Sequence, residues 1–278
     1  MTRTVGVVVP AFRPDVERLR DYVTAIHRRL DPDVVRIELD EPDPGVVEEL
    51  ADLPATVHVA DRRRGKGAAI TAGFEALSTD VLAFADADGA TPAESLATVV
   101  ARVVADEADL AVGSRRHPEA TVASHQTVAR RHLGDAFAWL ARRLLDADLY
   151  DFQCGAKALT RECWTAVRGH LHESGFAWDI ELVAVAGALG HRVAEVPVVW
   201  EDQPGSTVSP VETTLRLGVG LLRARLRASA LQGSRLAGLL AGDGPPLIER
   251  PAVASGPRET ANTHEPANTR ETASDGGR

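Results

Sequence analysis

Residues 79–89 read Thr-Asp-Val-Leu-Ala-Phe-Ala-Asp-Ala-Asp-Gly, and this stretch decides how the rest of the chain is interpreted. Its apolar run, residues 81–85, predicts a short buried strand that ends on two carboxylates, Asp86 and Asp88. Because side chains on extended backbone point the same way at every second residue, both carboxylates are expected to face one site. Two hard oxygen ligands favour Mg²⁺ or Mn²⁺, ions that commonly share their coordination shell with substrate phosphates.

An Asp-x-Asp-Gly sequence after a strand has other interpretations. The simplest is a solvated turn that binds nothing. An EF-hand loop is excluded because it requires glycine at its sixth position, whereas Gly89 is fourth. Phosphotransferases of the haloacid dehalogenase type carry the same motif but place threonine where this chain has Ala90. A metal-dependent phosphatase therefore stays a remote alternative.

Short apolar runs alternate with amphipathic segments over residues 4–113, which predicts an α/β fold with a mainly parallel sheet and helices on both faces. The expected strands are 5–9, 34–39, 56–60, 81–85 and 110–112, and the expected helices are 15–30, 45–51, 66–77 and one after Thr91. Such sheets bind ligands at the carboxyl ends of their strands. The residues predicted at this edge are Pro10, Ala11, Asp40, Asp61 and Asp86.

A basic turn with two glycines, residues 62–69, lies between a predicted strand and a predicted helix on the same edge. Its spacing differs from that of a Walker loop. Cations and glycines before a helix start still suit a diphosphate, so Lys66 is predicted to bind the diphosphate of a substrate. A flexible basic turn is the alternative.

Seven motifs occur in an order that resembles family 2 glycosyltransferases. Four of them are Val-Val-Val-Pro-Ala-Phe at 7–12, Arg-Gly-Lys-Gly-Ala-Ala at 64–69, Asp-Ala-Asp-Gly-Ala-Thr-Pro at 86–92 and Gly-Ser-Arg at 113–115. Three more resemble the dolichyl-phosphate glucose and mannose synthases within that family: Asp-Phe-Gln-Cys-Gly-Ala-Lys at 151–157, Gly-Phe-Ala-Trp-Asp-Ile-Glu-Leu at 175–182 and Glu-Val-Pro-Val-Val-Trp at 195–200. The resemblance spans residues 4–208.

The resemblance implies a GT-A fold over residues 1–208, a divalent metal, and transfer of a hexose with inversion from a nucleotide sugar to a polyprenyl (dolichyl) phosphate. A UDP-glucose-like donor is favoured because Thr207 stands where mannose synthases often carry lysine. GDP-mannose stays an alternative. Trp178 and Ala156 also replace the usual phenylalanines of their motifs, and are expected to change the shape of the sugar pocket.

The resemblance also implies roles for single residues. Asp40 falls where the family binds the base, Asp86 and Asp88 where it holds metal and diphosphate, Arg115 and Arg130 where it holds the acceptor phosphate, and Asp179 beside the acceptor. Pro10, Ala11, Lys66 and Gln153 lie in the substrate-binding motifs. A second interpretation is a glycosyltransferase with a soluble hydroxyl acceptor, in which Asp179 acts as the general base.

The formal net charge of −9 argues against a nucleic-acid partner, which normally requires a basic excess. The N-terminal residues show no signal-peptide pattern, and no run of 18 apolar residues occurs. We therefore expect a cytoplasmic protein. Any contact with a membrane is expected to be peripheral, on the cytoplasmic face.

Two segments, 128–145 and 211–231, combine an apolar stripe with arginines. In the second, Leu215, Val219, Leu222 and Leu226 are predicted on one face, with Arg216, Arg223 and Arg227 on another. Residues 209–241 thus suit a helix in the membrane interface, although a helix packed on the core gives the same pattern. Residues 242–278 are rich in Pro, Gly, Thr, Asn and Glu, which predicts a disordered tail.

Overall fold

The computed structural model describes residues 3–123, 139–145, 147–201, 210–241 and 244–250. Within these residues seven strands form one sheet in the order β3-β2-β1-β4-β7-β5-β8. The strands are β1 (Val5–Phe12), β2 (Val34–Asp40), β3 (Thr56–Ala60), β4 (Val81–Ala85), β5 (Leu110–Ser114), β7 (Ala156–Thr160) and β8 (Val193–Pro197). Only β7 is antiparallel to its two neighbours among these strands, which confirms the predicted mainly parallel sheet.

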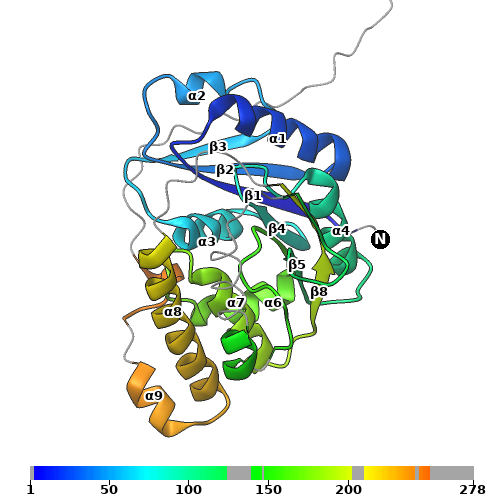
Figure 1. Cartoon of the computed structure of the whole chain (residues 1–278). Coiled ribbons are helices and arrows are strands. Elements are labelled where there is room, and N and C mark those ends of the chain that lie inside the picture. Colours follow the sequence, from blue (N-terminus) through cyan, green and yellow to red (C-terminus); the bar gives the residue numbers. More distant parts are fainter. Residues whose placement is uncertain (1–2, 124–138, 146, 202–209, 242–243, 251–278) are drawn as a thin grey trace, which may run out of the picture.

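Helices cover both faces of the sheet, as predicted (Figure 1). One face carries α1 (Val16–Leu30), the short α2 (Val46–Glu49) and α4 (Ala93–Val104). The other carries α3 (Lys66–Ala76), α6 (Arg161–Val167), the 3-10 turn η1 (Arg168–His170) and α7 (Trp178–Ala188). Beyond α7 lie α8 (Pro210–Leu231), α9 (Arg235–Ala241) and the 3-10 turn η2 (Leu247–Glu249).

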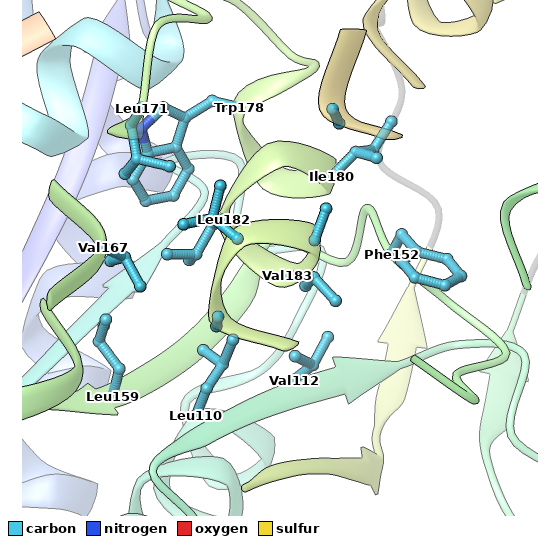
Figure 2. Packing of buried hydrophobic residues seen from close by; sticks show 14 of the residues in the cluster. Leu110, Val112, Phe152, Leu159, Val167, Leu171, Trp178, Ile180, Leu182 and Val183 are labelled. Carbon is cyan, nitrogen blue, oxygen red and sulfur yellow. The ribbon is translucent and has the colours of Figure 1, made fainter. Parts of the chain in front are cut away.

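Strand β4 shows why the central strands lack polar alternation. Every residue of β4 is buried, because Val81, Ala83 and Ala85 pack under α1 and α4 while Leu82 and Phe84 pack under α3 and α7. A strand covered on both faces needs apolar side chains at every position. Figure 2 shows the hydrophobic core between the sheet and the face covered by α3, α6 and α7. Side chains of α7 lie there beside residues of β5, β7 and the segment around α6: Trp178, Ile180, Leu182 and Val183 beside Leu110, Val112, Leu159, Val167 and Leu171.

Two strands differ from the prediction at their ends. Strand β1 continues three residues beyond the expected end at Val9, because Pro10, Ala11 and Phe12 keep their parallel register with β2. The proline is tolerated there by a fixed φ that suits extended backbone. Strand β5 likewise continues to Ser114, beside Pro197 of β8. Both extensions carry the chain directly to the carboxyl edge of the sheet, where the predicted site residues lie.

Helix α8 packs against α7 through Leu217, Leu221, Ala224 and Ala228, which are buried in the core. The predicted apolar stripe lies elsewhere on this helix, since Val219 and Leu222 are exposed. Helix α8 therefore has a buried apolar face that the sequence pattern did not identify.

Arg227 has a different environment from Arg216 and Arg223, with which it was predicted to share one face of this helix. It is buried and pairs with Glu181 of α7, so it faces the protein interior. Arg216 and Arg223 are exposed, as predicted. The side chain of Leu215 lies outside the described residues.

Several remaining predictions fall partly outside the described residues. Of the segment 128–145 only the end is described, and residues 139–144 are helical there.

Strand β6 (Thr121–Ala123) pairs with β9 (Val199–Glu201) in a small separate ladder. In the predicted tail, Leu247 is buried against the core, whereas residues 251–278 lie outside the described part. The described helices include none that is both long and apolar enough to cross a membrane.

Candidate active site

Asp86 leaves the end of β4 and forms the centre of the site. Its carboxylate lies 2.8 Å from Lys66 Nζ at the start of α3, and its backbone N–H donates to the carbonyl of Gly155 at 2.9 Å. A Cβ atom at residue 155 would lie 2.1 Å from the Asp86 carboxylate, so only glycine leaves room for this side chain. About 38% of the Asp86 side chain is exposed, which leaves it open to a ligand.

Asp88 lies beside Asp86, as the Asp-x-Asp spacing predicted. Burial raises the pKa of Asp88, and the negative charge of Asp86 raises it further. Its Oδ1 accepts a hydrogen bond from the N–H of Ala90 at 3.0 Å, which fixes the turn. Two carboxylates that repel one another fit a divalent cation, because the cation would relieve their repulsion.

The described residues contain no group of three or more His, Cys, Asp or Glu side chains arranged to hold a metal ion. Asp86 and Asp88 would therefore supply two ligands, and the other ligands would be substrate oxygens and water. Mg²⁺ is commonly bound in this way, with one or two carboxylates plus substrate phosphates. The residues present thus fit the predicted metal.

Tyr22 of α1 supports the turn after these two carboxylates. Gly89 has a φ of 66°, in the left-handed region, and a Cβ there would lie 3.4 Å from the Tyr22 ring. The Tyr22 hydroxyl donates to the carbonyl of Thr91 at 2.6 Å. The sequence carries no local signal for this contact, because residues 22 and 91 meet only through packing of α1 on the sheet.

Asp179, at the start of α7, is held between two lysines. Lys66 Nζ lies 2.9 Å from its Oδ2, and Lys157 Nζ lies 2.6 Å from its Oδ1. Burial works to raise the pKa of Asp179, but Lys157 and Lys66 outweigh it and hold the pKa below its usual value. A carboxylate that is 1% exposed and neutralised by two cations is a poor general base.

Lys157 is a residue whose role the sequence reasoning missed. It is fully buried on β7, and its ammonium group also donates to the carbonyl of Cys154 at 2.8 Å. The chain has only two lysines, Lys66 and Lys157, and both bind Asp179. The scarcity of lysine, read together with 29 arginines, was a signal that could have pointed to these two positions.

Lys66 links the two carboxylates of the site. Burial lowers the pKa of Lys66, but Asp179 and Asp86 outweigh it and keep the ammonium group charged. The loop before it is fixed, because Gly65 has a φ of 97° and a Cβ there would lie 2.5 Å from the carbonyl oxygen of Ser174. One cation is thereby placed beside the predicted diphosphate position.

Arg115 follows β5 and is bound by Asp151 through two hydrogen bonds, from Nε at 2.7 Å and from Nη2 at 3.0 Å. Burial works to raise the pKa of Asp151, but Arg115 lowers it to about 2. Burial works to lower the pKa of Arg115, but Asp151 outweighs it and Asp86 adds a smaller contribution, so the guanidinium stays charged. A guanidinium has five N–H donors, so Arg115 keeps donors for a second anion.

Asp40, to which the resemblance assigns binding of the base, contacts the basic turn in the structure. Its carboxylate is 2% exposed and accepts hydrogen bonds from the N–H groups of Arg64 and Gly65 and from Arg64 Nε at 2.7 Å. It therefore fixes the basic turn that carries Lys66. Arg63 of that turn lies over the Phe12 ring, with 4.2 Å between its Cζ and the ring centroid, and this stacked pair was also missed from the sequence.

Other predicted residues contribute less directly. Pro10 is half-buried within β1, and Ala11 is buried in the core. The backbone N–H of Gln153 donates to Asp151 at 3.0 Å. Asp61 is exposed, and Arg130 lies outside the described residues.

Trp178 corrects the expectation of an altered sugar pocket. It is fully buried, packs edge-on against Phe74 and Phe84, and its indole N–H donates to Thr71 at 3.1 Å. A side chain with no exposed surface cannot touch a sugar, so this substitution changes core packing. The structure thus brings together Asp86, Asp88, Lys66 and Asp179, with Arg115 nearby.

Solved structures with the same arrangement of elements share the GT-A fold. Mannosyl-3-phosphoglycerate synthase from Rubrobacter xylanophilus superposes with a TM-score of 0.61 at 19% identity, over 83% of this chain and 75% of that one. Glucosyl-3-phosphoglycerate synthase from Mycobacterium tuberculosis, crystallised with Mn²⁺, UDP and glucosyl-3-phosphoglycerate, gives 0.58 at 19% identity, over 83% and 80%. The predicted GT-A fold is confirmed.

Curated relatives are similar in sequence. Glycosyltransferase AglD from Haloferax volcanii is 33% identical over 231 residues, 79% of this chain and 36% of that protein. Dolichyl-phosphate beta-glucosyltransferase from Mus musculus is 34% identical over 171 residues, 60% and 53% respectively. The chain spans about half the length of these relatives or less. A family model described as glycosyl transferase family 2 matches residues 7–161, more than half of the chain, and the chain therefore belongs to glycosyl transferase family 2.

Proposed function

We propose that this protein transfers glucose from UDP-glucose to a polyprenyl phosphate of the dolichyl type, with inversion at the sugar carbon. The observation that carries the proposal is the state of Asp179, which is buried and neutralised by Lys66 and Lys157. A site without a free base at this position suits an acceptor that needs no deprotonation. The choice of acceptor and sugar in this proposal follows the relatives named dolichyl-phosphate beta-glucosyltransferase.

At the donor side, Asp86 and Asp88 would hold Mg²⁺ or Mn²⁺ together with the diphosphate of the nucleotide sugar. The ion would stabilise the negative charge that develops on the leaving nucleotide. Lys66 adds a fixed positive charge 2.8 Å from Asp86, in a position to bind the same diphosphate. Solved structures of the same fold were crystallised with Mn²⁺ or Mg²⁺ and UDP.

At the acceptor side, a phosphate monoester has a second pKa of about 6 and is mostly a dianion at neutral pH. It is already a nucleophile, and its main requirement is to be held in line with the sugar carbon. Arg115 suits this task, because its guanidinium is oriented by Asp151 and keeps donors on its outer edge. Arg130 is proposed for the same phosphate on the strength of its motif position.

A soluble hydroxyl acceptor is the competing reaction, and the two solved structures compared above are named as phosphoglycerate synthases. At 19% identity these structures show the fold alone. A hydroxyl acceptor must lose its proton during attack, which needs a positioned base. Asp179 does not meet that need, since both its oxygens accept from lysines. The phosphatase alternative is wrong, because the chain belongs to glycosyl transferase family 2.

The donor and the location complete the proposal. GDP-mannose is less favoured than UDP-glucose, because the relatives that share a third of their residues with this chain are named glucosyltransferases. A lipid acceptor and a water-soluble donor meet at a membrane surface, and we place the reaction on the cytoplasmic face.

The test is transfer by the purified protein from a panel of nucleotide sugars to polyprenyl phosphate in detergent, with 3-phosphoglycerate as the competing acceptor. We expect a lipid-extractable glucoside from UDP-glucose, and loss of turnover with EDTA that Mn²⁺ or Mg²⁺ restores. Asp88→Asn should lower turnover by roughly a hundredfold or more, because one oriented charge stabiliser contributes ~3–4 kcal/mol. A soluble glycoside as the main product would replace the lipid acceptor by a hydroxyl acceptor.

A further inference from the structure

The short helix α9 carries three strongly exposed leucines. Leu236, Leu239 and Leu240 are 75%, 80% and 70% exposed, the highest values among the large apolar side chains of the described residues. Their spacing of three and four residues places them on one face of the helix. Ala237 is buried, so this helix is packed against the protein by its other face. Helices α8 and α9 form an arm at the edge of the molecule (Figure 1).

A cavity of about 480 Å³ lies beside this leucine face, between α8, α9 and the loop that precedes α7. Its lining includes Arg223 and Arg227 of α8, Leu240 of α9, and Arg250. His172, Glu173 and Ser174 form the side toward α7. The cavity therefore combines cationic walls with an apolar lip.

The charge of this cavity differs from that of the whole chain. Three lining arginines against the single lining glutamate, Glu173, leave a formal excess of two positive charges, although the chain carries −9. Glu181 beneath Arg227 cancels at most one of them. Arg250 donates to the carbonyls of Pro245 and His172, and neither partner neutralises its charge. A net positive cavity remains on an acidic protein.

We propose that this arm docks on an anionic phospholipid membrane, with a lipid phosphate in the arginine cavity and the leucines of α9 in the boundary of the acyl chains. Apolar side chains beside cations are the combination that binds a helix to such an interface. The guanidinium fork of an arginine matches phosphate oxygens.

A second copy of the chain is a poorer occupant of this face. A symmetric dimer would bring two positive cavities toward one another, because the same patch meets itself across a two-fold axis. The repulsion would oppose the contact. A membrane presents apolar and anionic groups together, as the arm requires.

The arm is also connected to the candidate active site. The carbonyl of Ser174, a cavity residue, accepts a hydrogen bond from the N–H of Ala68 at 3.2 Å and lies against Gly65. The loop that carries Lys66 therefore rests directly on the wall of the proposed lipid site. The inference rests on the proposed function and deepens it, because a polyprenyl phosphate acceptor lies in such a membrane.

The experiment is sedimentation of the full chain with vesicles of phosphatidylcholine alone and of phosphatidylcholine with phosphatidylglycerol. We expect binding to the anionic vesicles that weakens with salt. The double variant L236S/L239S should bind about tenfold less or weaker still, because it removes two large apolar side chains from the interface. Arg223→Ala should lose about fivefold on the anionic vesicles.

Matched controls use exposed residues of the same kind away from the arm. V104S/L189S replaces two exposed apolar side chains elsewhere, and Arg28→Ala removes an exposed arginine of α1. Both should bind as the wild type does, and circular dichroism should show that all variants are folded. Equal losses in the controls, or wild-type binding by L236S/L239S, would overturn the proposal.

Two further outcomes would assign another binding partner to the arm and would therefore also overturn the proposal. One is a wild-type dimer that L236S/L239S dissociates, without vesicle binding by either form. The other is binding of free glycerol 3-phosphate that depends on Arg223, with no leucine dependence on vesicles. Transfer to polyprenyl phosphate in detergent, measured on the same variants, separates the two proposals. Vesicle binding without any transfer would refute the proposed function alone, and transfer without arm-dependent binding would refute only this inference.

Discussion

At the scale of single residues, Gly155 decides whether the acidic centre can form. The Asp86 carboxylate occupies the space that a side chain at residue 155 would need, with 2.1 Å between Asp86 Oδ2 and the position of a Cβ. Asp86 cannot be in its place beside any other residue, because atoms that close overlap. The glycine of the Gln-Cys-Gly motif thus has a steric role in positioning Asp86, which we propose as a ligand of the metal.

We expect Gly155→Ala to lower turnover by about a hundredfold or more, since a displaced carboxylate loses most of its electrostatic effect. Steady-state kinetics with UDP-glucose and polyprenyl phosphate would measure it. Gly169→Ala is the matched control, because no atom lies within 4 Å of a Cβ at that position. Near-normal turnover in Gly155→Ala would show that Asp86 has no fixed role.

Asp179 provides a test of the acceptor chemistry. Its lowered pKa keeps it ionised throughout the range in which a phosphate monoester titrates. We therefore expect the rate to fall below about pH 6, where the acceptor phosphate takes up its second proton. Asp179→Asn should be slower, because Lys66 and Lys157 lose their shared partner, but should keep the same acidic limb in its pH–rate profile. Loss of that limb in the variant would identify Asp179 as the titrating base.

At the scale of elements, α8 has two apolar faces, of which one is buried and the other exposed. Leu221 is fully buried against α7, whereas the adjacent Leu222 is 56% exposed. The pattern of hydrophobic residues alone does not distinguish these faces, because both leucine rows recur at helical spacing. Packing against α7 decides which of them belongs to the core.

We expect Leu221→Ala to lower the free energy of unfolding by about 2–5 kcal/mol, because it leaves a cavity between α7 and α8. Leu222→Ala, one residue away and of the same chemistry, should change it by less than about 0.5 kcal/mol. Urea denaturation of both variants provides the comparison. Equal effects would mean that α8 is not held on the core as the structure describes.

At the scale of the whole molecule, Glu181 joins the arm to α7, the helix that carries Asp179. Its Oε2 accepts from the N–H groups of His172 and Glu173 at 2.9 and 2.8 Å, and its Oε1 contacts Arg227 of α8. Burial raises the pKa of Glu181 to about 7, although Arg227 opposes the shift. One carboxylate thus ties together α7, the loop before it and α8.

This contact predicts a dependence of stability on pH. Between the ordinary pKa of 4.5 and about 7, folded Glu181 holds a proton that the unfolded chain has lost. Stability therefore falls as pH rises through this window and is level above it. The difference in free energy of unfolding between wild type and Glu181→Gln should drop by on the order of 1–3 kcal/mol from pH 5 to pH 8.

Denaturant titrations across this pH range would measure that difference. Glu162→Gln, an exposed glutamate on α6, should show a constant difference from the wild type. A constant difference for Glu181→Gln as well would contradict the burial argument.

Local pattern was enough to predict five of the seven strands of the main sheet, four of its covering helices and the acidic strand end, whereas β7, β8, α6 and α7 were not predicted. Val81–Ala85 was placed at its observed bounds, and Asp86 and Asp88 lie side by side as their spacing required. These features depend on neighbours in the chain, since strand burial and side-chain direction follow from consecutive residues. The ordered motifs identified the family for the same reason.

Contacts between residues far apart in the sequence were decided only by the tertiary structure. Lys66 and Asp179 are 113 positions apart and meet because α3 and α7 pack on the same face of the sheet. Packing also placed Asp40 beside Arg64 and buried Arg227 of α8 against Glu181 of α7. A buried charged side chain needs a partner that compensates for its lost hydration. The folded structure decides which residue is that partner, because the partner can be far away in the sequence.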